Sequence, residues 1–143
     1  MLRKFWRKKI SPHTGEKASE RAGRLFDAGY NCTQSVLQAT SGIDDPAMME
    51  MADAFGGGIG NSRCLCGAVT GGVMALGLRG KGKESGKLVA AFKERNRTTC
   101  CKGLSAPYTW NSKEHLANCR RLTVEAAAMT IELLGEEPPF EKN

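Results

Sequence analysis

The sequence predicts an all-α protein: an antiparallel helical bundle of about five helices, with a glycine-rich loop before the central helix. Three observations favour this class. Apolar residues recur at helical spacing in several segments. No alternating strand pattern extends beyond a few residues. The prolines leave long segments uninterrupted, since they stand only at positions 12, 46, 107, 138 and 139.

The first two helices are expected over 15–28 and 32–41. Apolar residues mark one stripe of the first helix, and Gly29 is suited to end it. Asn31 can cap the second helix through its side-chain oxygen, and Gly42 follows its last residue.

A short helix over 46–54 is predicted next, because Pro46 suits the first turn of a helix. A glycine-rich loop follows, which has backbone freedom and permits close approach to another group. No Gly-Lys-Ser/Thr follows it and no strand precedes it, so it does not resemble a phosphate-binding loop. Its candidate binding residues are Gly56, Gly57, Gly58 and Gly60.

Three further helices are expected over 66–78, 85–103 and 112–134, with a loop over 104–110. In the first of them, small residues four positions apart would let a second helix approach closely. That contact is either an internal one between central helices or the face of a homodimer. Gly135 is expected to end the last helix.

At 143 residues the chain fits one domain, which we divide into an arm (1–14), a cysteine-rich bundle (15–135) and a polar tail (136–143). No apolar run is long enough to span a membrane, and no secretory signal is visible. We therefore expect a cytoplasmic protein, and in a reducing compartment cysteines are more often metal-binding or catalytic than paired in structural disulfides.

The net charge of +6 comes largely from the arm, which holds five basic residues and no acidic one. The remainder is nearly neutral, so we expect no nucleic-acid partner. Leu2, Phe5, Trp6 and Ile10 follow helical spacing between the basic residues. Residues 2–10 are thus typical of a helix that lies on a membrane surface or docks on a partner. A frayed end, or a helix packed on the body of the protein, is the alternative.

Four cysteines lie far apart in the sequence, each within a predicted helix: Cys32, Cys66, Cys101 and Cys119. Cys119 lies on the apolar stripe of its helix. Cys32 and Cys66 fall in first turns, where the helix dipole favours a thiolate. If the bundle brings the four together, they would suit an iron–sulfur cluster or zinc. Burial as small apolar side chains is the alternative.

Other candidate ligands are less suited to such a site. His13 falls in the arm, and His115 is expected to be exposed near the start of the last helix. Cys64 and Cys100 lie beside Cys66 and Cys101, and they are spare ligands, redox partners or packing residues.

The chain resembles the small helical C_GCAxxG_C_C family, described as redox-active proteins. The resemblance spans roughly 18–134 and is most specific at Cys66-Gly67-Ala68-Val69-Thr70-Gly71. It implies that the signature cysteines are Cys32, Cys66, Cys101 and Cys119. It further implies a link to transporters, since members are often encoded beside transporter genes, and an iron–sulfur centre has been suggested for related domains.

Three functions follow from these patterns. The first is a redox or redox-sensing module that holds an iron–sulfur cluster, such as [2Fe–2S], on the four cysteines, with the glycine loop donating N–H groups to its sulfur atoms. The second is a metal-free thiol–disulfide protein in which Cys66, near Arg63, attacks and Cys64, Cys32 or Cys101 resolves. The third is a structural zinc site or a plain interaction bundle. Only the second would be an enzyme, a thiol–disulfide oxidoreductase, and the redox partner is unspecified.

Overall fold

The computed structural model describes residues 11–138. The predicted arm at 2–10 and the end of the tail lie outside the described residues. Within them the protein is all-α, with no strand, as the sequence predicts. The α-helices are α2 (Ala18–Asp27), α3 (Cys32–Ser41), α4 (Pro46–Asp53), α5 (Gly67–Leu78), α6 (Ser85–Asn96), α7 (Cys101–Leu104) and α8 (Lys113–Leu134), with short 3₁₀ turns at Ile59–Asn61 and Gly82–Glu84.

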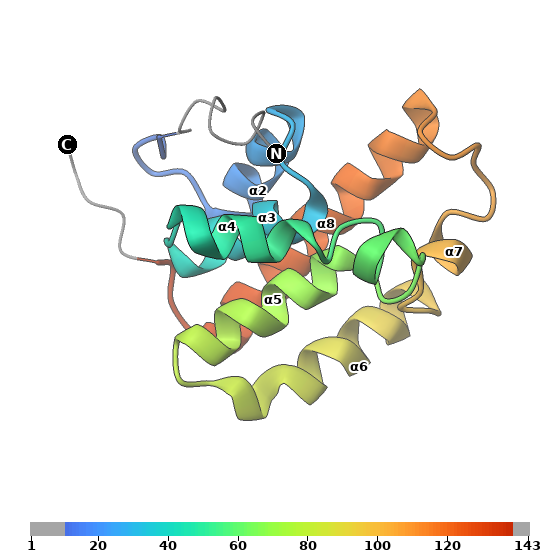
Figure 1. Ribbon diagram of the computed structural model, residues 1–143. Helices are drawn as coiled ribbons and strands as arrows, with labels where there is room; N and C mark the ends of the chain where they lie inside the picture. Colours follow the sequence, from blue (N-terminus) through green and yellow to red (C-terminus); the bar gives the residue numbers. More distant parts are fainter. Residues whose placement is uncertain (1–10, 139–143) are drawn as a thin grey trace.

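Helix α3 lies at the centre of the bundle, in contact with α2, α4, α5 and α8 (Figure 1). Its start is defined by a capping box: the Asn31 side chain accepts the Gln34 N–H at 2.9 Å, and the Gln34 side chain accepts the Asn31 N–H at 3.0 Å. Gly42 ends the helix in the left-handed conformation, with φ of 76°. The predicted bounds of this helix are therefore confirmed.

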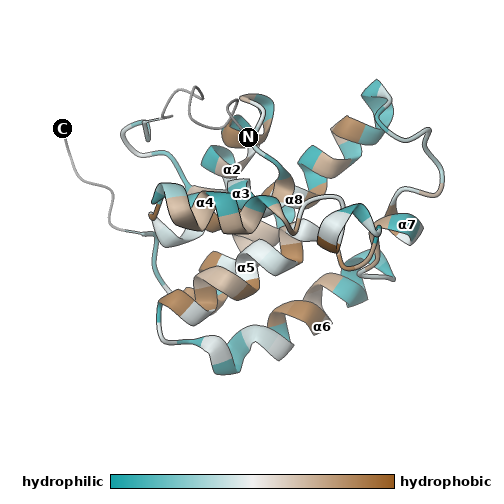
Figure 2. Cartoon of the chain, viewed as in Figure 1, coloured by the Kyte–Doolittle hydropathy of each residue, from teal (hydrophilic) through white to brown (hydrophobic). Residues whose placement is uncertain are grey.

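Helix α5 packs on α3 through its glycines. A Cβ placed on Gly71 would lie 2.5 Å from the Thr33 carbonyl oxygen, so only glycine lets the two backbones approach this closely. Figure 2 shows apolar residues along the whole of α5, as expected of a helix covered by neighbours on most faces. The small residues thus serve an internal contact between α3 and α5.

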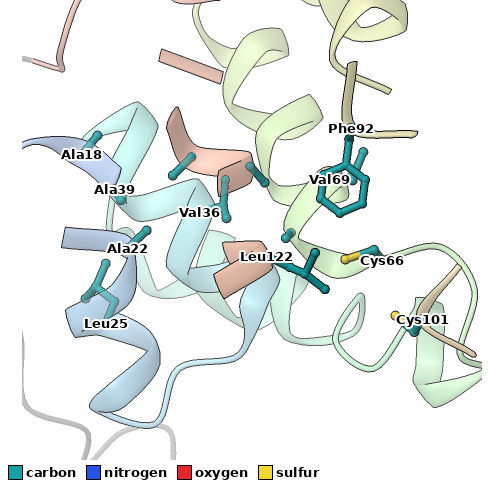
Figure 3. Packing of buried hydrophobic residues seen from close by; sticks show 13 residues of the cluster. Ala18, Ala22, Leu25, Val36, Ala39, Cys66, Val69, Phe92, Cys101 and Leu122 are labelled. Carbon is teal, nitrogen blue, oxygen red and sulfur yellow. The ribbon is translucent and has the colours of Figure 1, made fainter. Parts of the chain in front are cut away.

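The main core joins residues from α2, α3, α5, α6 and α8 (Figure 3). Leu25, Val69 and Phe92 are fully buried there. The Cys66 and Cys101 side chains lie at one edge of this cluster, beside Leu122. The core therefore supports one side of the region in which these two cysteines meet.

The predicted continuous helix over 85–103 is wrong, because 97–100 are not helical and separate two helices. Helix α6 ends at Asn96, and Arg97 adopts the left-handed conformation with φ of 70°. Residues 98–100 are not helical, and α7 starts at Cys101. Backbone hydrogen bonds to a distant segment hold the region between the helices, with Cys66 N–H donating to the Thr99 carbonyl at 2.7 Å. This tertiary contact replaces the helical continuation.

In the described part of the chain, no helix is both long and apolar enough to cross a membrane.

Candidate functional site

The four cysteines that the sequence singles out meet at one pocket of about 440 Å³. Cys32, Cys66, Cys101 and Cys119 all line it, each from a different helix or helix start. Aromatic and apolar side chains complete the wall, including Tyr30 and Trp110. The bundle thus brings together sulfur atoms that are widely separated in the sequence.

Three of these cysteines occupy helix N-termini. Cys32 is the first residue of α3, Cys66 is the N-cap of α5, and Cys101 is the first residue of α7. At such positions free backbone N–H groups and the positive end of the helix dipole stabilise a thiolate. Cys119 differs, since it lies within α8 and faces the pocket from its side.

Cys66 and Cys101 line the same pocket, and each thiol shifts the pKa of the other. The hydrogen bond from the Cys66 thiol lowers the pKa of Cys101 to about 7, and the N–H groups of Gly67 and Cys101 itself act in the same direction. The same hydrogen bond, together with burial, raises the pKa of Cys66. Cys101 is therefore the more readily ionised of the two thiols near neutral pH. This reverses the expectation that Cys66 would be the attacking thiolate.

The other two pocket cysteines stay protonated at neutral pH. Burial raises the pKa of Cys119 to about 12, and repulsion by Cys32 and Cys101 adds to the effect. Burial also raises the pKa of Cys32, although the N–H groups of Gly57 and Thr33 partly oppose this. The pocket thus holds one readily ionised thiol among three that keep their protons.

His115 also belongs to the pocket, contrary to the expectation that it would be exposed. It is 3% exposed and packs on Trp110 with ring centroids 4.3 Å apart. Its Nδ1 accepts the Asn111 N–H at 2.9 Å, so the neutral ring carries its proton on Nε2. That Nε2 lies 3.1 Å from Ser105 Oγ and 3.4 Å from Cys119 Sγ.

Burial, and then the charge of Arg63, lowers the pKa of His115, so the ring is neutral at neutral pH. His115 therefore offers Nε2–H as a donor to Ser105 or to the Cys119 sulfur. One signal in the sequence could have revealed its position. His115 precedes Cys119 by four residues and Leu122 by seven, which places all three on one face of a helix.

The glycine loop reaches the pocket at one of its four predicted positions. Gly57 lines the pocket, and its N–H partly opposes the raised pKa of Cys32. Gly56 packs on the Asn31 side chain, and Gly58 packs on the backbone at Arg63 and Cys64. A Cβ on Gly60 would meet no atom within 4 Å. The loop thus shapes the site mainly by close packing.

The pocket thiols are not grouped around a single point. Within residues 11–138, no set of three or more His, Cys, Asp or Glu side chains is arranged to ligate one metal ion. His13 lies away from the pocket, with its ring near Glu16. The four cysteines thus line one pocket, but their side chains do not surround a single point as the ligands of one metal ion would.

A comparison with protein families matches residues 30–133 to a family described as "Putative redox-active protein (C_GCAxxG_C_C)". The chain belongs to this family. Membership in the C_GCAxxG_C_C family confirms the resemblance drawn from the sequence, and the matched region contains all six cysteines and all of the pocket lining except Phe26 and Gly29. Comparisons with curated proteins and with solved structures gave no match.

Proposed function

We propose that the protein carries out thiol–disulfide redox chemistry at its pocket, with Cys101 as the attacking thiolate and Cys66 as the resolving thiol. The observation that carries the proposal is that Cys66 and Cys101 line the same pocket, where the Cys66 thiol lowers the pKa of Cys101 to about 7. A thiol with a pKa near ambient pH combines a large thiolate fraction with good nucleophilicity. Membership in a redox-active family supports the same reading.

The chemistry balances with a disulfide as the oxidant. The Cys101 thiolate attacks one sulfur of the incoming disulfide, which forms a mixed disulfide and releases the first thiolate. Cys66 then loses its proton and attacks the Cys101 sulfur, which releases the second thiolate and leaves a Cys66–Cys101 disulfide. Two electrons pass from the protein to the substrate disulfide, and reduction runs the same steps in reverse.

The roles of the two cysteines can be separated with glutathione disulfide. Cys66→Ser keeps a hydrogen-bond donor beside Cys101 but removes the resolving sulfur, so we expect a stable glutathione adduct on Cys101 by mass spectrometry. Cys101→Ser is expected to give no adduct on Cys66, because burial still raises the pKa of that thiol and shields it from glutathione disulfide. The matched control Cys119→Ser should still form the Cys66–Cys101 disulfide. An adduct on Cys66 in Cys101→Ser, or none in Cys66→Ser, would overturn the assignment.

A metal centre is the second candidate, because all four signature cysteines line one pocket. Their soft thiolates suit iron–sulfur ligation, and no carboxylate lines the pocket beside them. A [2Fe–2S] cluster takes two thiolates at each iron, whereas zinc needs four ligands around one point. Since no such group is arranged around one point within 11–138, the cluster fits these thiols better than structural zinc.

Cys32, Cys66, Cys101 and Cys119 would hold such a cluster, which when bound supplies one-electron transfer. The Gly57 N–H, which acts on the Cys32 thiol from the pocket wall, would then tune its potential. Reconstitution without oxygen, using iron and sulfide, tests this candidate. Visible absorption with bound iron that is lost in Cys119→Ser would favour the cluster, and colourless iron-free protein would exclude it.

A redox partner, a cytoplasmic location and membrane or transporter contact through residues 2–10 stay predictions.

A further inference from the structure

A second pair of cysteines lies outside the pocket. The sulfur atoms of Cys64 and Cys100 are 2.9 Å apart, and neither residue is among the pocket lining or the four signature cysteines. Cys64 is exposed and Cys100 half-buried, whereas Cys66 and Cys101 are only 5% and 9% exposed. The chain therefore carries an outer thiol pair in solvent and an inner pair in the pocket.

The backbone holds the two pairs next to each other. Cys66 N–H donates to the Thr99 carbonyl at 2.7 Å, and Lys102 N–H donates to the Arg63 carbonyl at 3.0 Å. These bonds clamp the segments 63–66 and 99–102 side by side. Each segment contributes one outer and one inner cysteine, so each outer thiol is one or two residues from an inner thiol.

Further bonds fix the outer pair from both sides. Cys100 N–H donates to Thr98 Oγ1 at 3.2 Å, and the Ser62 hydroxyl donates to the Cys64 carbonyl at 2.9 Å. Arg63 N–H donates to the Gly57 carbonyl at 2.9 Å, which ties the same segment to the glycine loop at the pocket. Two thiols held this close by an ordered backbone lose little conformational freedom when they join.

We propose that Cys64 and Cys100 form a reversible surface disulfide that relays reducing equivalents from an external protein dithiol to the Cys66–Cys101 disulfide. The relay rests on the thiol–disulfide function proposed for the pocket. A folded protein dithiol can approach Cys64 in solvent but has little access to the inner sulfur atoms. The external dithiol therefore reacts with the outer pair, and the outer pair reacts with the inner cysteines.

The relay balances in two exchanges. The external dithiol reduces the Cys64–Cys100 disulfide and itself becomes a disulfide. One outer thiolate then attacks an inner sulfur, which forms a mixed disulfide and frees the other inner thiolate. The second outer thiolate attacks the outer sulfur of that bond, which restores the Cys64–Cys100 disulfide and frees the remaining inner thiol. The outer pair gives up two protons and the inner pair gains two.

The test begins with fully oxidised protein and follows reduction of the Cys66–Cys101 disulfide by mass spectrometry. The reductants are reduced thioredoxin, a folded protein dithiol, and the small dithiothreitol. We expect Cys64→Ser/Cys100→Ser to react with thioredoxin at least about tenfold more slowly than the wild type, and with dithiothreitol at a similar rate. The control Ile59→Ala, which alters an exposed side chain of the neighbouring glycine loop but keeps both cysteines, should match the wild type with both reductants.

The outcomes separate the relay from the function on which it rests. If the double variant forms the inner disulfide but thioredoxin reduces it at the wild-type rate, the relay is wrong and the pocket function stands. The relay also fails if oxidised wild-type protein shows no Cys64–Cys100 disulfide. If no inner disulfide forms in either protein, the pocket function fails and the relay fails with it. Circular dichroism of both variants checks that they fold.

Discussion

Replacing Cys66 with alanine is expected to slow alkylation of Cys101 about fifty-fold at pH 7. The substitution removes the thiol whose hydrogen bond is the largest cause of the lowered pKa of Cys101. It leaves the Gly67 N–H in place, which partly offsets the burial that disfavours the thiolate. The pKa of Cys101 should therefore return toward its ordinary value, and its reactivity should move to higher pH.

The magnitude follows from the size of the shift. The pKa of Cys101 is lowered from 9.0 to about 7, which corresponds to about 3 kcal/mol in favour of the thiolate. With the pair intact, about half of Cys101 is ionised at pH 7, whereas at the ordinary pKa only about 1% is ionised. Because only the thiolate reacts, the ratio of these fractions sets the loss of rate.

The assay measures iodoacetamide modification of the Cys101 peptide by mass spectrometry from about pH 5 to about pH 10. In the wild type, the reactivity of Cys101 should rise with pH around pH 7. In Cys66→Ala, the same rise should occur about two pH units higher. Cys66→Ser is the matched control, because its hydroxyl can still donate to the Cys101 sulfur, and it should stay close to the wild type. Identical profiles for Cys66→Ala and wild type would refute the Cys66 thiol as the cause of the lowered pKa of Cys101.

Three further predictions concern stability, measured by urea unfolding. Phe92→Ala empties a fully buried site and should cost about 3–5 kcal/mol, whereas Lys93→Ala on the exposed face should change little. Gly71→Ala presses a methyl group against the α3 backbone and should destabilise by about 1–3 kcal/mol. Gly86→Ala meets open space within α6 and should stabilise by about 0.5–1 kcal/mol. Asn31→Ala removes the α3 cap and should cost about 1 kcal/mol.

Each of these predictions has a contrary result. Similar unfolding free energies for Phe92→Ala and Lys93→Ala would contradict the core assignment. Equal effects of Gly71→Ala and Gly86→Ala would mean that close contact of α3 with α5 is not what requires glycine. An unchanged midpoint for Asn31→Ala would show that the capping box contributes nothing to the stability of α3.

Local signals predicted most of the helices. The capping residue Asn31 and the terminal Gly42 define α3, and α8 starts and ends within one residue of the expected bounds because Gly135 ends it. The end of α6 could not be predicted, since residues beyond Asn96 are held by backbone hydrogen bonds to a segment more than thirty positions away. Such contacts leave no periodic pattern in the sequence.

The sequence predicted which four cysteines meet in the pocket, but not how their pKa values differ. The positions of Cys32, Cys66, Cys101 and Cys119 in the pocket agree with the expectation that the fold would bring them together. The pKa of each pocket cysteine depends on its burial and on the thiols and N–H groups around it. The spacing of the cysteines along the sequence does not reveal these contacts. That His115 joins the pocket follows from helical spacing once Cys119 is known to face inward.

The most direct test of the account is a redox titration of the wild-type protein in glutathione buffers without oxygen, with disulfides mapped by mass spectrometry. We predict that Cys66 and Cys101 join and separate reversibly in a single two-electron transition, while Cys32 and Cys119 stay reduced. If Cys66 and Cys101 remained thiols at every potential, or each paired with a different cysteine, the central claim would be contradicted.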